Sequence, residues 1–198
     1  MRVVLATSNR GKLEELAGAF PRWNVHGLSE YPGIVMPEET GDTFEENARI
    51  KAVAVCEATG HPALADDSGL CVDALGGAPG VRSARFAGEG AGDAANRTLL
   101  RERMDTVEPA RRGAKFVCAL ALAMPDGRMD VVRAECAGTI LRVERGTGGF
   151  GYDPLFVPEG ETRTFAQMSV AEKEELSHRG HAIRLAREKF ARWLGDAL

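Results

Sequence analysis

At residues 63–72 the chain reads Ala63-Leu64-Ala65-Asp66-Asp67-Ser68-Gly69-Leu70-Cys71-Val72, so two adjacent carboxylates interrupt an apolar segment. We expect the first three residues to form a short buried strand that ends at Asp66. Two neighbouring carboxylates in an apolar environment repel each other and lose hydration. A divalent cation, which prefers oxygen ligands, commonly offsets this cost. The pair therefore predicts a metal site or a proton-transfer site. The alternative is an ordinary turn, because Asp, Ser and Gly all favour turns.

The composition indicates one globular domain. The chain has 198 residues, of which 44% are hydrophobic, enough for one ordinary core but not for two independent ones. We therefore expect residues 1–198 to form a single domain of one or two lobes.

The cysteines indicate the cellular compartment, and the net charge limits the classes of binding partner. The four cysteines form no C-x-x-C pair and three lie in apolar runs, as expected of buried thiols in a reducing, cytoplasmic compartment. No run approaches the roughly 20 apolar residues of a membrane span. The net charge of −4 offers no global attraction to nucleic acid or to an anionic membrane, so an anionic ligand would have to be held locally.

The N-terminal segment predicts a phosphate site. Residues 3–6 are apolar and of strand type, and a helical pattern begins near Leu13. The polar loop between them is Thr7-Ser8-Asn9-Arg10-Gly11-Lys12. It would lie at the amino end of the helix, where unpaired N–H groups and the dipole attract anions. It is not a Walker A loop, since Leu13 stands where Ser or Thr would hold magnesium, and the alternative is a capped helix with solvated basic residues.

A second carboxylate pair, Glu38-Glu39, precedes a predicted helix. The segment Thr43-Phe44-Glu45-Glu46 has the spacing of a capping box, and an apolar stripe with helical period follows as far as Gly60. Asn47 and Lys51 are four residues apart and share one face of that helix. Solvated polar residues are the commoner explanation for such a pair, so the sequence alone assigns them no role.

The middle of the chain indicates the fold class. A structural helix is expected over residues 93–104, and the almost wholly apolar residues 116–124 are typical of a strand covered on both faces. A turn signal, Pro125-Asp126-Gly127, and an alternating segment at 132–136 then predict a β-hairpin. Helices interleaved with strands, together with this hairpin, predict an α/β domain with a mixed central sheet.

A glycine-rich loop near residue 150 predicts a site for a flat ring. Gly146-Thr147-Gly148-Gly149-Phe150-Gly151 matches G-x-G-x-x-G, but it runs into Tyr152-Asp153-Pro154 and a strand-like segment instead of opening a helix, so we reject a dinucleotide site. Two aromatic rings and a carboxylate on such a loop suit stacking of a base and acceptance of a hydrogen bond from its ring N–H. The alternative is a tight turn with Phe150 in the core.

Basic residues gather near the C-terminus. A capping box, Ser169 to Glu172, predicts a short helix with Lys173 in its first turn; Ser177-His178-Arg179-Gly180 follows, and we expect a final amphipathic helix from Ala182. Cations at the start of a helix oppose its dipole. Lys173, His178 and Arg179 are therefore better explained by an anion or by carbonyl acceptors on a ligand.

Together these motifs resemble the inosine triphosphate pyrophosphatases, which cleave nonstandard purine nucleoside triphosphates such as ITP, dITP and XTP. The resemblance runs almost end to end and rests on six motifs in the family's order. They are Thr7-Ser8-Asn9-Arg10-Gly11-Lys12, Glu39-Thr40-Gly41-Asp42-Thr43-Phe44-Glu45-Glu46-Asn47-Ala48, Ala65-Asp66-Asp67-Ser68-Gly69-Leu70, Leu75-Gly76-Gly77-Ala78-Pro79-Gly80, Gly149-Phe150-Gly151-Tyr152-Asp153-Pro154 and Ser177-His178-Arg179-Gly180.

The resemblance implies a single bilobed α/β domain with a cleft between the lobes, a homodimer, and Mg²⁺ as cofactor. It implies that the triphosphate is held by Thr7 to Lys12, that Glu38 and Asp67 place the metal, and that Asp67 is the general base. Ser68 would contact the nucleotide. The base would be held and read by Phe150, Gly151, Tyr152, Asp153, Lys173, His178 and Arg179. Hydrolysis between the α and β phosphates would give the monophosphate and pyrophosphate.

Two alternatives remain at this point. A Maf-like nucleotide pyrophosphatase shares the general architecture but acts on other bases. A nucleotide-binding sensor without catalysis would need the phosphate cradle but not the acidic pair, so Asp66 and Asp67 argue against it.

Overall fold

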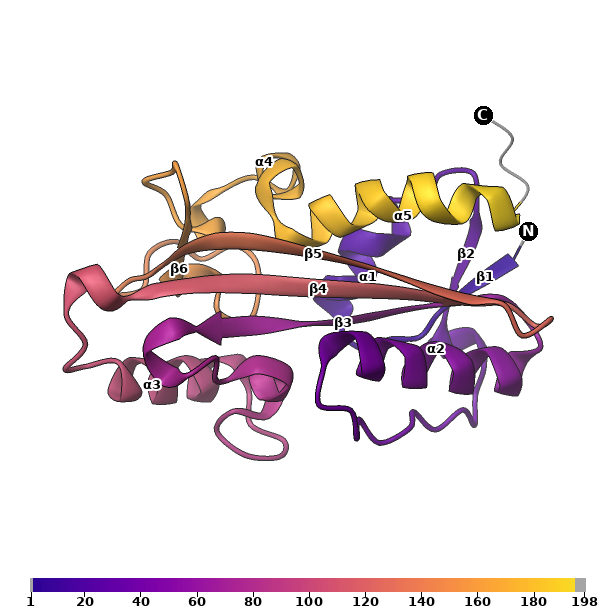
Figure 1. Cartoon of the computed structure of the whole chain (residues 1–198), viewed down its shortest axis with the longest axis horizontal. Helices are drawn as coiled ribbons and strands as arrows, with labels where there is room; N and C mark the ends of the chain where they lie inside the picture. Colours follow the sequence, from indigo (N-terminus) through magenta and orange to yellow (C-terminus); the bar gives the residue numbers. More distant parts are fainter. Residues whose placement is uncertain (1, 195–198) are drawn as a thin grey trace. The chain divides into compact units, whose positions relative to one another are not determined.

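The computed structural model describes residues 2–194. Its strands and helices follow one another in an α/β order (Figure 1). In chain order they are β1 (Arg2–Leu5), α1 (Arg10–Ala17), β2 (Asn24–Gly27), α2 (Phe44–Thr59), β3 (Ala63–Val72), α3 (Asp93–Arg103), β4 (Gly113–Ala123), β5 (Met129–Ile140), β6 (Phe156–Pro158), α4 (Val170–Leu176) and α5 (His178–Leu194).

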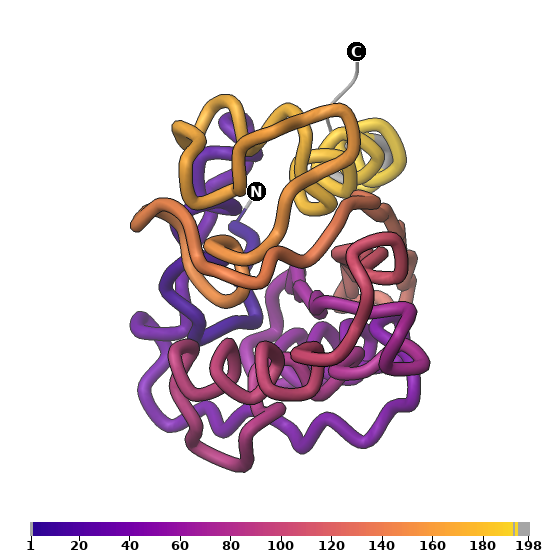
Figure 2. The backbone as a smooth tube through the Cα atoms, turned by 90° about the vertical axis from the view of Figure 1, so that its left-hand side faces the viewer, coloured from indigo at the N-terminus to yellow at the C-terminus, as the bar shows by residue number. Residues whose placement is uncertain are grey.

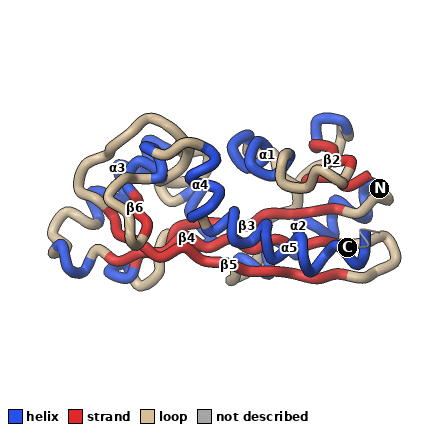
Figure 3. Tube along the Cα trace, turned by 90° about the horizontal axis from the view of Figure 1, so that it is seen from above, coloured by secondary structure: helices blue, strands red, loops and turns tan. Residues whose placement is uncertain are grey.

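The strands form one six-stranded sheet in the order β2-β1-β3-β4-β5-β6 (Figure 3). Strand β1 is parallel to β2 and β3, whereas β5 is antiparallel to β6. Strands β4 and β5 are neighbours joined by the turn that Pro125-Asp126-Gly127 predicts, in which Met124 N donates to Arg128 O at 2.9 Å. The mixed sheet and the hairpin are thus confirmed.

The chain divides into two compact units. Unit 1 comprises Met1–Asp67, Cys118–Ala134 and Ala182–Leu198, and unit 2 comprises Ser68–Val117 and Glu135–His181. The chain passes from one unit to the other inside β3, β4 and β5, and again near the start of α5.

The core of unit 1 explains why α1 and α5 are amphipathic. Figure 1 shows α5 on one side of the long strands and α2 on the other. Leu16 of α1 and Phe190 of α5 are fully buried in one cluster with Leu5, Leu64 and Leu120 of three strands. Burying a side chain of this size contributes about 1.5–3 kcal/mol, so the apolar stripe of each helix determines the face that packs on the sheet.

Strand β3 continues through the acidic pair, which corrects the expectation that the strand ends at Asp66. It runs from Ala63 to Val72, and Asp66 and Asp67 are 1% and 5% exposed. Strand β1 pairs with β3 at Ala63 and Leu64, before the acidic pair, and β4 is the other hydrogen-bonded neighbour of β3. Pairing within the sheet outweighs the turn preference of Asp, Ser and Gly. Gly69 does not form a turn. It allows the side chain of Ser83 to lie close to the strand, because a Cβ at residue 69 would collide with that side chain.

Unit 2 has a core of its own, built from strands, α3 and the loops between residues 140 and 170. Figure 2 looks at this unit from its own end, with α3 drawn as a pink coil. Phe116 of β4 meets Phe156 of β6 edge to face, with ring centroids 4.7 Å apart, and Phe165 and Leu100 are buried in the same cluster. The glycine-rich loop runs into a short 3-10 turn and then β6, so it opens no long helix, as predicted.

Helix α5 begins at His178, four residues before the predicted start at Ala182. The hydroxyl of Ser177 accepts a hydrogen bond from Gly180 N at 3.1 Å, as an N-terminal cap does. Gly180 allows this turn to lie against Glu174, because any Cβ would collide with the Glu174 carbonyl. His178 and Arg179 therefore lie in the first turn of α5.

None of the helices in residues 2–194 has the length and apolar content that a membrane crossing needs.

Candidate active site

The loop before α1 caps that helix. Asn9 is the N-cap residue, and its side-chain oxygen accepts from Lys12 N at 3.0 Å, while Asn9 N donates to the hydroxyl of Thr7 at 3.2 Å. No acidic residue lies in the first turn, so nothing there neutralises the positive end of the helix dipole. Arg10 is exposed and pairs with Glu14 at 2.9 Å. The capped helix and an anion site are compatible, since the cap occupies only one of the free N–H groups.

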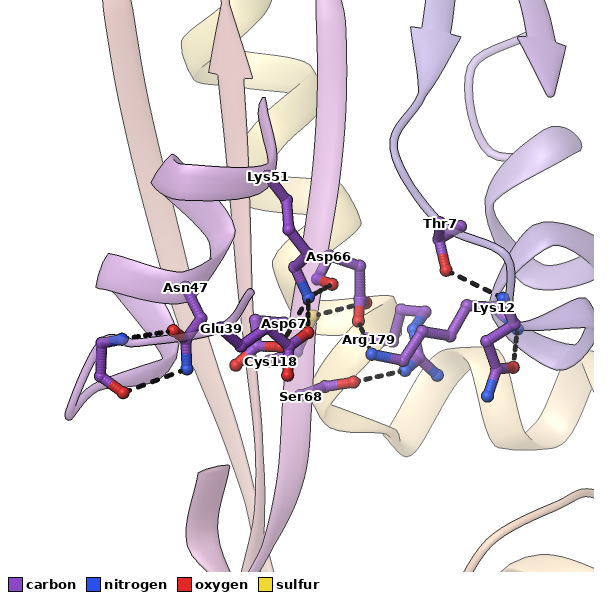
Figure 4. A network of polar contacts seen from close by, with 12 residues as sticks. Thr7, Lys12, Glu39, Asn47, Lys51, Asp66, Asp67, Ser68, Cys118 and Arg179 are labelled. Atoms are coloured by element: carbon purple, nitrogen blue, oxygen red, sulfur yellow. Dashed lines mark hydrogen bonds and ion pairs between the residues drawn. The ribbon is translucent and has the colours of Figure 1, made fainter. Parts of the chain in front are cut away.

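Asp66 is engaged on both carboxylate oxygens within unit 1. Lys12 Nζ lies 2.5 Å from Oδ1, and the Cys118 thiol donates to Oδ2 at 3.3 Å (Figure 4). The Asp66 side chain is 0% exposed and that of Lys12 is 14% exposed. The Asp66 carboxylate therefore holds the Lys12 ammonium beside β3.

Lys51 is the centre of the acidic site, although the sequence assigned it no role. Its ammonium donates to Asp67 Oδ1 at 2.6 Å, to Glu39 Oε1 at 2.8 Å and to Asp66 O at 2.9 Å (Figure 4). Lys51 is 6% exposed. Burial lowers the pKa of Lys51, but Asp67 and Glu39 outweigh this effect and raise it overall. A signal was present in the sequence, because Lys51 falls on the same helical face as the buried Ala48 and Val55.

Asp67 differs from Asp66 because only one of its two carboxylate oxygens has a hydrogen-bond partner in the described residues. Oδ1 accepts from Lys51, whereas the buried Oδ2 has no hydrogen-bond partner within residues 2–194. Burial raises the pKa of Asp67 to about 6, against the opposing effect of the Lys51 and Lys12 cations. A buried carboxylate with an oriented, unpartnered oxygen and a pKa near neutrality can accept a proton or bind a cation.

The two glutamates before α2 are placed differently. Glu39 is half-buried and shares Lys51 with Asp67, whereas Glu38, the residue that the resemblance implied for the metal, is exposed. Asn47 holds this segment on α2, since its side chain accepts from Gly41 N at 2.8 Å and donates to Gly41 O at 3.2 Å. A Cβ at residue 41 would collide with Asn47, so only glycine allows the contact.

Five predicted ligand-binding residues meet in unit 2. Asp153 Oδ2 accepts from Lys173 Nζ at 2.6 Å and from Phe150 N at 2.9 Å. Lys173 Nζ and Arg179 Cζ lie 4.6 Å and 5.5 Å from the centroid of the Phe150 ring, and Arg179 donates to the Ser68 hydroxyl at 2.8 Å. Phe150 is only half-buried, so it is not the core residue of the alternative interpretation.

The other predicted residues of the base site have structural partners. The phenol of Tyr152 is buried and donates to Ser83 O at 2.9 Å, and the His178 ring stacks on Phe116 at 4.7 Å. Gly151 is bound on both sides by α3, since its N–H donates to Asp93 at 2.7 Å and its carbonyl accepts from Arg97 at 2.9 Å.

Comparison with known proteins gives consistent findings. The sequence profile of the Ham1 family matches residues 3–189. A dITP/XTP pyrophosphatase of Streptomyces avermitilis is 52% identical over 187 residues, covering 92% of this chain and 94% of that protein. A dITP/XTP pyrophosphatase of Deinococcus radiodurans is 50% identical over 184 residues, covering 92% and 89%.

Solved structures agree with the sequence comparisons. The Ham1 protein of Staphylococcus aureus has a TM-score of 0.87 and 39% identity, with all of both chains covered. A nucleoside-triphosphatase, dITP/XTP pyrophosphatase, from Mycobacterium abscessus has a TM-score of 0.78 and 44% identity, covering 93% of this chain and 98% of that one.

Proposed function

Because the chain belongs to the Ham1 family, we propose that it hydrolyses nonstandard purine nucleoside triphosphates, such as dITP, ITP and XTP, to the monophosphate and pyrophosphate. The chain is a nucleoside triphosphate pyrophosphatase, and its relatives named dITP/XTP pyrophosphatase support this substrate class. Hydrolysis of such nucleotides would remove them from the pool used for nucleic acid synthesis.

The proposed chemistry rests on the different surroundings of the two carboxylate oxygens of Asp67. Lys51 holds Oδ1, and Oδ2 is buried without a partner in the described residues. We assign Oδ2 the task of accepting the proton of the attacking water. A positioned general base of this kind contributes about 10²–10⁴-fold to the rate.

The acidic residues suit Mg²⁺. This ion keeps several waters and usually takes only one or two protein carboxylates together with substrate phosphates. The Asp67 carboxylate would supply one ligand, with Oδ2 left as the base, and Glu39 or Glu38 would supply the second; we favour Glu39 because it shares Lys51 with Asp67. When bound, the ion would neutralise phosphate charge and polarise the phosphorus atom.

Comparing the Mg²⁺ affinity of Glu38→Gln and Glu39→Gln by titration calorimetry distinguishes the two glutamates.

The remaining roles divide between phosphate and base. We propose that residues 7–12 hold the triphosphate through the amino end of α1 and the Lys12 ammonium, which Asp66 fixes in place. The base would stack on Phe150 and be read by the charged residues around that ring, Lys173 and Arg179. Residues 1–198 would act as one catalytic domain, and a homodimer is the assembly that the resemblance implies.

The test is a panel of nucleotides with pyrophosphate detection. Purified protein with Mg²⁺ should hydrolyse ITP, dITP and XTP with kcat/KM at least about 100-fold above that for ATP, GTP and dTTP. A preference for a pyrimidine or a modified base would favour the Maf-like alternative. Absence of Mg²⁺-dependent turnover on every nucleotide would instead favour a sensor without catalysis.

A further inference from the structure

Helix α3 contacts the glycine-rich loop at one residue, Gly151. The carboxylate of Asp93, the first residue of the helix, accepts from Gly151 N at 2.7 Å. One turn later, Arg97 Nη1 donates to Gly151 O at 2.9 Å. Both polar groups of one loop residue are thus bound by charged side chains of a helix that lies more than 50 positions earlier in the sequence.

Arg97 is itself held in place before it contacts the loop. Its Nε donates to Glu144 Oε2 at 3.0 Å, and the two side chains are 18% and 32% exposed. A guanidinium with one edge fixed by a carboxylate loses little additional freedom when it donates to a second acceptor. Arg97 therefore binds Gly151 in a predetermined orientation.

The loop is fixed on the other side of Phe150 as well. Phe150 N donates to Asp153, and Gly148 N donates to Ala166 O at 3.0 Å. Gly149 has a φ of 69°, and a Cβ there would collide with the Asp153 carboxylate. With Gly151 bound by α3, the backbone on both sides of Phe150 is fixed, which fixes the position from which its ring projects beside Lys173 and Arg179.

We propose that Asp93 and Arg97 are positioning residues for base binding, which orient Phe150 through Gly151; this inference rests on the proposed function, in which Phe150 stacks on the base. A preorganised ring binds a base without first losing loop entropy, whereas a mobile loop has to be ordered at the moment of binding. The helix would thereby determine how tightly the base is held without contacting it. The phosphate site lies on different residues and should not depend on these contacts.

The experiment compares a ligand that has a base with one that has none. Dissociation constants of IMP and of inorganic tripolyphosphate are measured by calorimetry on the wild type, Arg97→Met and Asp93→Ala. We expect each variant to bind IMP about tenfold more weakly and tripolyphosphate within about twofold of the wild type. In turnover of ITP, KM should rise by a similar factor while kcat changes little.

Three control variants separate a loss of loop orientation from a general loss of structure. Arg101→Met removes another arginine of α3, whose Nε donates to Arg142 O at 3.3 Å, and it should bind IMP as the wild type does. Glu144→Gln removes the charge of this partner but keeps a side-chain oxygen that accepts from Arg97 Nε, so Arg97 stays oriented toward Gly151 and the variant should also bind IMP normally. Asp93→Asn keeps an acceptor for Gly151 N and should recover most of the affinity that Asp93→Ala loses, which excludes a simple failure to fold.

The proposal is overturned if Arg97→Met and Asp93→Ala bind IMP as tightly as the wild type. It is also overturned if IMP and tripolyphosphate weaken equally, because that pattern indicates a general loosening of the fold. A wild type that binds IMP no better than AMP would contradict the proposed function and, with it, this inference.

Discussion

Asp66 and Asp67 are neighbours in β3, yet their surroundings give them different chemistry. Successive residues of a strand point to opposite faces, so the two carboxylates meet different partners. Asp66 is occupied by Lys12 and Cys118, whereas Asp67 keeps one oxygen unpartnered in the described part of the chain. We infer that Asp66 orients a phosphate-binding lysine and that Asp67 carries the reaction.

Asp67→Asn should fold normally and lose nearly all turnover. The amide keeps the shape of the side chain but removes its basicity and its charge toward a metal. We expect at least a 100-fold loss in kcat, since a general base contributes about 10²–10⁴-fold. Circular dichroism and thermal unfolding provide the control for folding, and a folded variant with more than about a tenth of the wild-type rate would show that the role is misassigned.

Lys51→Met should destabilise the protein in a pH-dependent way. Removing one partner of a buried ion pair costs about 3–5 kcal/mol, because Asp67 and Glu39 lose their cation. Burial, no longer opposed by Lys51, should raise the pKa of Asp67 further above its unfolded value, so the folded variant takes up a proton as the pH falls. The stability deficit relative to the wild type should therefore be smaller at pH 5 than at pH 8, as measured by urea unfolding; an equal deficit at both would refute the pairing.

Arg179→Ala should change which base the enzyme accepts. Hypoxanthine presents O6 as an acceptor to the guanidinium, whereas adenine presents an amino group that faces another donor. A site that hydrogen-bonds one group rejects an analogue without it by up to about 10⁴-fold, while stacking on Phe150 tolerates every base. We expect kcat/KM to fall strongly for ITP and much less for ATP, with the ratio of ITP to GTP largely kept. Equal losses on ITP and ATP would mean that Arg179 positions the nucleotide without reading its base.

The sequence indicated candidate site residues where the signal was local. The acidic pair, the loop before α1 and the cations near residue 178 all stand out within a few residues of one another. Lys51 did not, because its contacts with Asp66 and Asp67 join residues 15 and 16 positions apart and form only once α2 packs beside β3. The roles of Asn47 and Arg97 depend on similarly distant partners, Gly41 and Gly151.

At the scale of the elements, α2 is the clearest agreement between sequence and structure. Thr43 caps the helix by accepting from Glu46 N at 3.2 Å, and Glu46 in turn accepts from Thr43 N at 3.1 Å. Gly60 ends the helix in the left-handed region with a φ of 67°. Both signals act within four residues, so they can be identified without knowledge of the fold.

Thr43→Ala should lower the free energy of unfolding by about 1 kcal/mol, because it removes the acceptor for one helix N–H. Urea unfolding measures the change, and Thr40→Ala, at an exposed residue of the preceding loop, is the matched control. If both variants unfold at the wild-type midpoint, the capping box contributes nothing to stability.

The predicted boundaries of β3 and α5 were wrong because tertiary contacts determine where these elements end or begin. Strand β3 passes through Asp66-Asp67-Ser68-Gly69 because it is paired with β4 in the sheet, and α5 starts at His178 because Gly180 fits against Glu174. Neither neighbour can be identified from the residues themselves. In both places the misjudged boundary lies at predicted ligand-binding residues, which is where local preference and function compete.

At the scale of the whole molecule, the two units carry different parts of the proposed reaction. Unit 1 contains Lys12, Lys51 and Asp67, which suit phosphate and metal chemistry, and unit 2 contains the cations and the aromatic ring that suit a base. Asp67 is the last residue of the first segment of unit 1, and Ser68 begins unit 2. Strand β3 thus links the two sets of residues through one peptide bond.

The products formed from ITP test this account most directly. A nucleotide held at both its phosphates and its base should be attacked at one phosphorus only. With ITP and Mg²⁺, ion-exchange chromatography should therefore show IMP and pyrophosphate appearing in equal amounts from the first turnover, with no IDP. Stepwise release of phosphate through an IDP intermediate would contradict the account.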